Sequence, residues 1–283
     1  MAGRRNEVLG DFLRTRRARI QPDGFGADLS GIRRVPGLRR EELADRAGVS
    51  QDYYARLEQG RHPTVSASVL DSLSRALRLN AVEHAYLHTV ATRSSSSHAI
   101  VMGHPTLAAV QRTLDILGST PAVAFRADAR AVAVNDAARF FFPGFEQFGH
   151  GVKWVLTSSA QELYGDAWEA AASNTIGSMR NFLGGRRASP RVESMIAELG
   201  RRNSFFRRVW EGHEVSDGLL GIQKVHHPHL GHALVTSELM TVNSLPGLYF
   251  YLVVPEEKGE FEAAMRSARL YSRQAASLPP STS

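Results

Sequence analysis

Three polar side chains in one short segment have the chemistry needed to recognise base pairs. Gln51, Asp52 and Arg56 lie within QDYYARLEQG, residues 51–60. A Gln amide can pair with adenine, an Arg guanidinium with O6 and N7 of guanine, and an Asp carboxylate can accept from N4 of cytosine. We therefore predict that these three residues contact DNA bases. Two alternatives remain open: an exposed polar face, or Asp52 orienting Arg56 across one helical turn.

The surrounding segment has the pattern of two helices joined by a tight turn. In LRREELADRAGVSQDYYARLEQG, residues 38–60, Gly48 falls where the first helix must end, because glycine adopts a left-handed conformation without steric cost. Ser50 is then expected to cap the second helix. This spacing predicts a helix-turn-helix, whose second helix enters the DNA major groove. The expected inward positions are Leu43, Ala44, Ala47, Val49, Tyr54 and Leu57.

Further residues around this segment are expected to contact the DNA backbone, since cationic and hydroxyl groups commonly bind phosphates. Arg39 and Arg40 fall in the first turn of the first helix, and Arg61 follows the second. For the arginines the alternative is a solvated charged face. The complete predicted set is Arg33, Arg34, Arg39, Arg40, Ser50, Tyr53 and Arg61.

Three more helices are expected around this pair, at residues 6–19, 66–78 and 81–92. In the first of them, the pattern places Arg14, Arg16 and Arg17 on the outward face. Residues 20–37, rich in Gly, Pro and Arg, are predicted to form a loop. Residues 1–93 thus form an all-α domain of five helices, and they contain 16 Arg, no Lys and 11 acidic residues. This positive excess suits a surface that faces phosphates.

The composition limits the remaining possibilities. A chain of 283 residues suggests two domains, and the absence of cysteine excludes disulfides, thiolate catalysis and Cys-based zinc sites. The N-terminus lacks the apolar region of a signal peptide, and no apolar run approaches the ~18 residues needed to span a bilayer. We therefore expect a cytoplasmic, nucleoid-associated protein with no membrane partner. The excess of 31 Arg over 3 Lys is most simply explained by a GC-rich genome.

After a polar linker at 94–104, the pattern changes to mixed strands and helices. PAVAFRADARAVAVN alternates around a polar turn at 127–130 and predicts a β-hairpin. Three later strands are expected at 219–226, 233–241 and 248–254. The result is an α+β domain over 105–256 with a mostly antiparallel sheet, followed by a C-terminal helix and tail at 257–283. The expected helices cover 105–118, 136–142, 150–156, 160–183, 189–201 and 203–212.

Many aromatic residues of this second domain could surround an apolar cavity. The alternative is the larger core that a larger domain requires. The candidate ligand-binding residues are Trp154, Phe182, Trp210, His213 and Tyr249. His213 could contact a polar head group or be a hydrogen-bonded structural histidine.

Several motifs resemble one family of actinobacterial regulators, the MmyB-like transcription regulators. RVPGLRREE, DYYARLEQGR and VLDSLSRAL carry the similarity in the first domain, and FFRRVWEGHEV, KVHHPHLGHALV and LYFYLVVP carry it in the second. The resemblance implies a repressor-like five-helix DNA-binding fold followed by a PAS-like α+β domain. It also implies an apolar effector, such as a fatty acid or another acyl compound.

Other site chemistries find less support. The histidines of VHHPHLGH have no adjacent carboxylate, and neighbouring positions of a strand point to opposite faces, so we predict no metal and no cofactor. Asn135 is expected to cap the helix that follows it. The motifs of serine hydrolases, P-loop enzymes, zinc proteases and dinucleotide-binding enzymes are all missing from the sequence, so no catalytic residue is predicted. The four histidines are His226, His227, His229 and His232.

The leading hypothesis is a transcription regulator that binds a double-stranded DNA operator as a homodimer and senses an apolar small molecule. Ligand would alter the spacing of two recognition helices, which must match half-sites about 34–36 Å apart. The main alternative makes the second domain a protein-interaction and dimerisation module without a ligand. An enzyme fused to a DNA-binding domain is the third and least supported hypothesis.

Overall fold

The computed structural model describes residues 6–21, 37–61, 64–92, 106–184, 188–241 and 247–257, with 259, 261, 263 and 265–267. By their contacts, residues Met1–Ser96 and Leu183–Ser216 form one compact unit. Residues Ser97–Phe182 and Asp217–Ser283 form the other. The predicted linker at 94–104 and the arginines Arg33 and Arg34 lie outside the described residues. Most of the predicted loop at 20–37 and the end of the predicted tail at 257–283 also lie outside them.

The five predicted N-terminal helices are confirmed. Their side-chain caps explain where three of them begin: Asn6, Ser50 and Ser66 accept hydrogen bonds from Leu9 N, Tyr53 N and Val69 N. The helices are α1 (Glu7–Arg19), α2 (Arg40–Ala47), α3 (Gln51–Glu58), α4 (Ala67–Ala76) and α5 (Ala81–Thr92).

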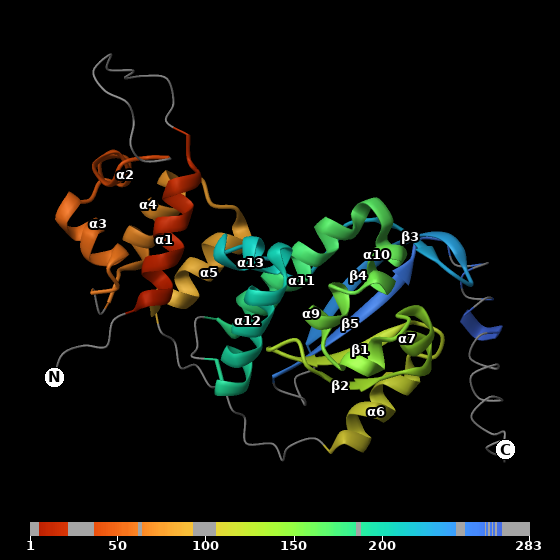
Figure 1. Cartoon of the computed structure of the whole chain (residues 1–283). Coiled ribbons are helices and arrows are strands. Elements are labelled where there is room, and N and C mark those ends of the chain that lie inside the picture. The colour runs from red at the N-terminus through yellow and green to blue at the C-terminus, as the bar shows by residue number, and fades with distance from the viewer. Residues whose placement is uncertain are drawn as a thin grey trace. The chain divides into compact units, whose positions relative to one another are not determined.

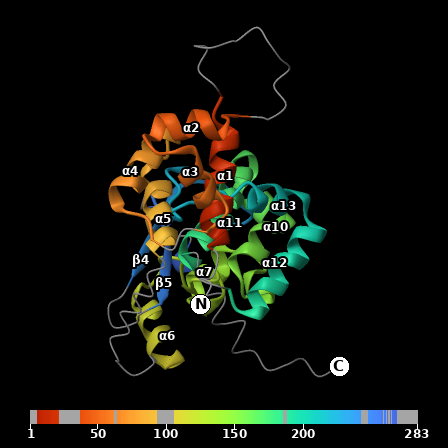
Figure 2. The same cartoon turned by 90° about the vertical axis from the view of Figure 1, so that its left-hand side faces the viewer.

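Helices α2 and α3 form the predicted helix-turn-helix and lie side by side in both views (Figure 1, Figure 2). Gly48 ends α2 in the left-handed conformation, with φ of 67°. Tyr54 and Leu57 of α3 are buried with Leu43 of α2 in the core of the unit, and Val49 packs against that core. Burial of these side chains fixes the direction in which the opposite side of α3 points.

The prediction for α1 is wrong at two of its three arginines. Arg14 is exposed as expected, but Arg16 and Arg17 are buried. Each buried guanidinium has a carboxylate partner. Arg17 Nε lies 2.6 Å from Glu58 Oε1, and Arg16 Nη2 lies 3.0 Å from Glu83 Oε1. A pattern of apolar positions along one helix contains no information about such partners on other helices.

Two later helices belong to this unit, namely α12 (Pro190–Arg202) and α13 (Ser204–Glu211). Arg16 Nη2 donates to the carbonyl of His213 at 2.9 Å. Arg19 Nη2 donates to Glu214 Oε1 at 2.7 Å and to the carbonyl of Gly212. These hydrogen bonds attach the end of the α13 segment to α1.

The second unit is built on an antiparallel sheet of five strands in the order β2-β1-β5-β4-β3. The predicted hairpin and the last two strands are confirmed. The first late strand begins later than predicted, and its expected residues Leu219 and Ile222 stay exposed. The strands are β1 (Ala122–Arg126), β2 (Ala131–Val134), β3 (Gln223–His227), β4 (Gly231–Thr241) and β5 (Leu248–Pro255).

Helices cover both faces of this sheet (Figure 1). The predicted helix at 160–183 is interrupted at Gly165, which has φ of 49° and ψ of −127°, a conformation that favours glycine. The helices are α6 (Leu107–Ile116), α7 (Asp136–Phe141), α8 (Phe145–Phe148), α9 (Gly151–Val155), α10 (Ser158–Tyr164), the 3-10 turn η1 (Gly165–Ala167) and α11 (Trp168–Leu183).

Alternation along the strands gives the two sheet faces different roles. Ala122 and Ala124 of β1 pair with Leu252 and Phe250 of β5, and this face packs against Val110 and Leu114 of α6. Val123, Phe125, Tyr249 and Tyr251 point to the other face. That second face is the one that lines a cavity.

Two polar residues of this unit have structural roles. Asn135 accepts from Ala138 N at 2.9 Å and from Ala122 N at 3.0 Å, which confirms the predicted cap. His227 Nε2 contacts the Phe140 carbonyl at 3.0 Å while Nδ1 accepts from His229 N at 3.1 Å, so the ring is neutral with its proton on Nε2. His226 is exposed and His227 buried, as the alternation predicts.

In the described part of the chain, no helix has both the length and the apolar character that crossing a bilayer requires.

Candidate functional site

The first candidate site is the outer side of α3. Gln51, Asp52 and Arg56 are all exposed there, opposite the buried Tyr54 and Leu57. Among the described ion pairs there is none between Asp52 and Arg56, so the structure gives no support to an orienting role for Asp52. The arrangement leaves an amide, a carboxylate and a guanidinium available to partners outside the chain.

A buried carboxylate fixes α3 to its neighbours. Glu58 is only 1% exposed and hydrogen-bonds Arg17 Nε and Arg40 Nε, each at 2.6 Å. Burial alone would raise the pKa of Glu58, but the hydrogen bonds and charges of Arg17 and Arg40 outweigh it and hold that pKa below its usual value. Burial, together with the charge of Glu58, raises the pKa of the Tyr54 hydroxyl, which therefore stays protonated.

Arg40 therefore has a structural partner in addition to its predicted role. Its side chain pairs with Glu58 and is still 49% exposed, so part of it can reach a phosphate. Arg39 and Arg61 are also exposed, and the Arg39 backbone N–H donates to Glu42. Ser50 uses its hydroxyl as the α3 cap, and Tyr53 is half-buried. Arg33 and Arg34 lie outside the described residues.

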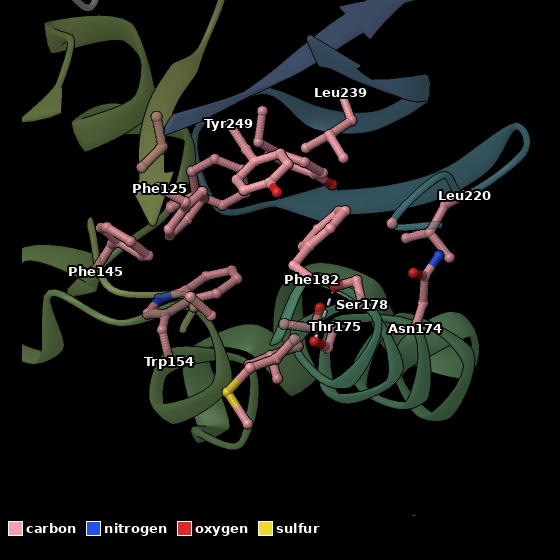
Figure 3. A pocket seen from close by; sticks show the side chains of 18 of the residues that line it. Phe125, Phe145, Trp154, Asn174, Thr175, Ser178, Phe182, Leu220, Leu239 and Tyr249 are labelled. Carbon is pink, nitrogen blue, oxygen red and sulfur yellow. Dashed lines mark hydrogen bonds between the residues drawn. The ribbon is translucent and has the colours of Figure 1, made fainter. Parts of the chain in front are cut away.

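The second candidate site is an apolar pocket in the other unit, between the sheet, α9 and α11 (Figure 3). Its free volume is about 90 Å³. Phe182 of α11 stacks on Tyr249 of β5, with ring centroids 4.3 Å apart and planes inclined by 22°. Other lining residues are Phe125, Phe142, Phe145, Trp154, Met179, Leu220 and Leu239.

The polar groups of the pocket are few and lie on separate walls. Asn174, Thr175 and Ser178 project from α11 on the side away from Trp154 and Phe145, as Figure 3 shows. On the sheet side, burial raises the pKa of Tyr251, and its hydroxyl also hydrogen-bonds Ser237 and Tyr164. Arg126, at the end of β1, is exposed and is the one charged residue among the described lining. Such a lining suits an apolar molecule with a small polar or anionic end.

The structure brings together three of the five predicted ligand residues. Trp154, Phe182 and Tyr249 line the pocket. Trp210 and His213 are absent from the described lining and belong to the other unit. There Trp210 stacks on Phe206 at 5.7 Å, and the His213 carbonyl accepts from Arg16. Aromatic content alone cannot distinguish a residue of the pocket from one of a separate helix pair.

Other pocket residues were missed by the sequence analysis. Phe125 had a usable signal, because strand alternation places it on the same face as Val123. The signal for Asn174, Thr175 and Ser178 was weaker: they lie on one side of α11 at helical spacing, but the helix carries other polar residues as well. Polar residues at such spacing more often face solvent, so the sequence alone would place these three side chains on the solvent side of α11 and not in the pocket.

Comparisons with known proteins assign both parts of the chain to domain families. The model for the MmyB-like transcription regulator ligand binding domain matches residues 107–268, which is more than half of the chain. A helix-turn-helix domain model matches residues 8–87. No curated protein matches the chain significantly. Since the ligand-binding domain model covers more than half of the chain and a helix-turn-helix domain precedes it, this chain belongs to the MmyB-like transcription regulators.

Proposed function

We propose that this DNA-binding transcription regulator senses an apolar small molecule in the pocket of its second domain and thereby changes its affinity for an operator. The observation that carries the proposal is the aromatic pocket, with polar side chains of α11 on one wall and the exposed Arg126 of the sheet also among its lining. A fatty acid or related acyl compound fits this chemistry, because its tail is apolar and its carboxylate can pair with a guanidinium.

On the DNA side, we assign base contacts to Gln51, Asp52 and Arg56. Backbone contacts are assigned to Arg39, Arg40 and Arg61 around them, with Ser50, Tyr53, Arg33 and Arg34 as the remaining members of the predicted set. The exposure of the α3 face supports this assignment, since base readout requires side chains that no other part of the domain covers.

The size of the pocket constrains the ligand. A free volume of about 90 Å³ is below the ~150 Å³ of a cavity that holds one benzene molecule. A long acyl chain therefore enters only if lining side chains move. Phe182 is the side chain we expect to move, because it is half-buried and stacked on Tyr249 rather than enclosed by the core.

The connectivity of the chain suggests how such a movement reaches the DNA-binding helices. Phe182 and Gly218 both line the pocket, and they stand directly before and shortly after the segment Leu183–Ser216. That segment belongs to the helical unit, where Gly212, His213 and Glu214 bond to Arg16 and Arg19 of α1. A ligand that displaces both ends of the segment can thus bias the helical unit.

We retain the sequence-based division of the chain as part of the proposal. It comprises a DNA-binding domain at 1–93, a linker at 94–104, a ligand domain at 105–256 and a C-terminal segment at 257–283. The limits of the two family matches, 8–87 and 107–268, support the first three of these. In this division α12 and α13 are a part of the ligand domain that packs with the DNA-binding helices. We also propose that the protein acts at the nucleoid as a homodimer.

The test is operator binding measured with and without ligand. DNA bound by the full chain is first selected from a random pool, and its affinity is then measured across a series of fatty acids. Ligand is expected to change the affinity about tenfold. Ser178→Phe fills the pocket from α11 and should abolish this response while ligand-free DNA binding persists.

The matched control is Ala170→Phe, which adds the same ring to an exposed position of the same helix. It should respond to ligand as the unmodified chain does. Absence of any response across the series, with no lipid co-purifying in native mass spectrometry, would instead favour the interaction-module alternative. An equal response from Ser178→Phe would place the ligand elsewhere.

A further inference from the structure

We propose that Asp71, His84 and His88 form a binding site for a divalent transition-metal ion of the zinc class, joining α4 to α5 in the helical unit. The sequence pattern draws attention only to the histidines at 226–232, for which no metal is predicted. The new group lies elsewhere, and its three ligand atoms are all within 4.8 Å of one another.

The helices bring these residues together for a simple geometric reason. His84 and His88 are four positions apart on α5, so their side chains lie on the same face one turn apart. Asp71 stands on α4, which packs against α5. Buried Leu73 of α4 and Leu87 of α5 hold the two backbones in the core, so this juxtaposition is set by packing.

Two of the three ligand-atom distances bracket the value for tetrahedral coordination. With zinc bonded to nitrogen and oxygen at about 2.1 Å, neighbouring ligand atoms in a tetrahedron stand about 3.4 Å apart. Asp71 Oδ1 lies 3.0 Å from His88 Nε2 and 3.7 Å from His84 Nε2, on either side of that value. The shorter contact is a hydrogen bond from His88 Nε2–H, and a metal ion takes the place of that proton when it binds. Small side-chain rotations suffice to equalise the two distances. All three side chains are partly exposed, so a water molecule can complete the coordination.

Ser74 supplies the kind of supporting contact that metal-binding histidines use. Its hydroxyl lies 2.9 Å from His84 Nδ1. When Nδ1–H donates to Ser74, the lone pair of Nε2 points toward the Asp71 carboxylate, at 3.7 Å, which is beyond hydrogen-bonding distance. Two electron-rich atoms then converge, and a cation between them stabilises the arrangement. Imidazole ligands favour zinc, cobalt or nickel over magnesium and calcium.

The experiment titrates the full, tag-free chain with Co²⁺, monitored by visible absorption, and with Zn²⁺, monitored by the midpoint of thermal unfolding. We expect one ion per chain and a higher unfolding temperature with Zn²⁺. The double substitution His84→Ala with His88→Ala should lower affinity at least tenfold. Asp71→Asn keeps the side-chain shape and should also weaken binding about tenfold, which guards against a simple loss of folding.

The matched control removes the other close histidine pair. His226 and His232 face each other across β3 and β4 with ring centroids 4.5 Å apart, but the structure gives them no third ligand in the described residues. His226→Ala with His232→Ala should leave the main affinity unchanged. Equal affinity in the unmodified chain and the His84/His88 variant would overturn the proposal, as would the absence of Zn²⁺ binding in the unmodified chain. None of these readouts depends on operator or effector binding.

Discussion

Arginine serves two different purposes around α3. Arg56 is exposed on the outer side of α3, whereas Arg17 is buried against Glu58 at the end of the same helix. A buried guanidinium is tolerated only with a partner of opposite charge, and an exposed one gains specificity from bidentate hydrogen bonding. The same residue type therefore positions the recognition helix and also supplies its outward chemistry.

For the exposed arginine, substitution should change sequence preference more than folding. Arg56→Ala is expected to weaken operator binding by about 1–3 kcal/mol and to relax preference at one base pair, since it removes the proposed bidentate contact to guanine. The measurement is a set of affinities for operators mutated at each position. Arg112→Ala, an exposed position on α6 of the other unit, is the control and should bind normally. Unaltered discrimination by Arg56→Ala would exclude the assigned contact.

For the buried pair, substitution should reduce stability instead. Glu58→Gln leaves Arg17 buried without its counter-charge, which costs about 3 kcal/mol in the free energy of unfolding at neutral pH. Because the pKa of Glu58 is lowered by folding, its contribution is complete above the unfolded value of about 4.3 and is lost as pH falls through the folded value. Urea unfolding across pH should show the difference from the unmodified chain shrinking in acid.

An exposed carboxylate on the preceding helix provides the comparison. Asp45→Asn on α2 is expected to alter stability by no more than about 0.5 kcal/mol. A Glu58→Gln variant that unfolds like Asp45→Asn would mean that the pair with Arg17 and Arg40 contributes little.

At the scale of elements, local signals predicted most helices and strands. Capping residues such as Ser50 and Ser66 act within three residues, and strand alternation acts within two, so both are visible in a short stretch of sequence. Gly48 ended α2 as predicted. Gly165 interrupted a helix that was predicted as continuous, because nothing local distinguishes a glycine that stays helical from one that adopts positive φ.

The sequence was least informative where partners are distant along the chain. Arg17 and Glu58 are 41 positions apart, and Arg16 and His213 are 197 apart, so neither contact has a local pattern. The same limit explains why Trp210 was wrongly predicted to line the pocket, since it belongs to a helix pair grouped with the N-terminal unit. It also explains why the proposed metal site was not predicted, since Asp71 and His84 lie on different helices. Which segments pack together depends on the apolar surface that the whole fold buries, and this cannot be read from any one segment.

At the scale of the whole molecule, operator recognition by a dimer requires a surface that joins two copies. For the proposed homodimer we expect this surface on part of the sheet face that α6 packs against. Leu234 and Met240 project from β4 on that face, since Met240 is paired with Phe250 and alternation places both on the same side. They are 47% and 51% exposed, although both are apolar. Exposed apolar side chains on a sheet face are typical of association surfaces.

The final prediction is that Leu234→Arg combined with Met240→Glu converts the proposed homodimer into a monomer. Light scattering coupled to gel filtration should show half the mass of the unmodified chain. Operator affinity should fall and its dependence on salt should become about half as steep, because one DNA-binding domain releases about half the counterions of two. Phe148→Gln, an exposed aromatic on α8 away from this face, is the control and should remain dimeric. If the double variant keeps the mass of the unmodified chain, the two copies associate through another surface. If the unmodified chain is itself a monomer, the homodimer proposal is wrong and any two half-sites are bound independently.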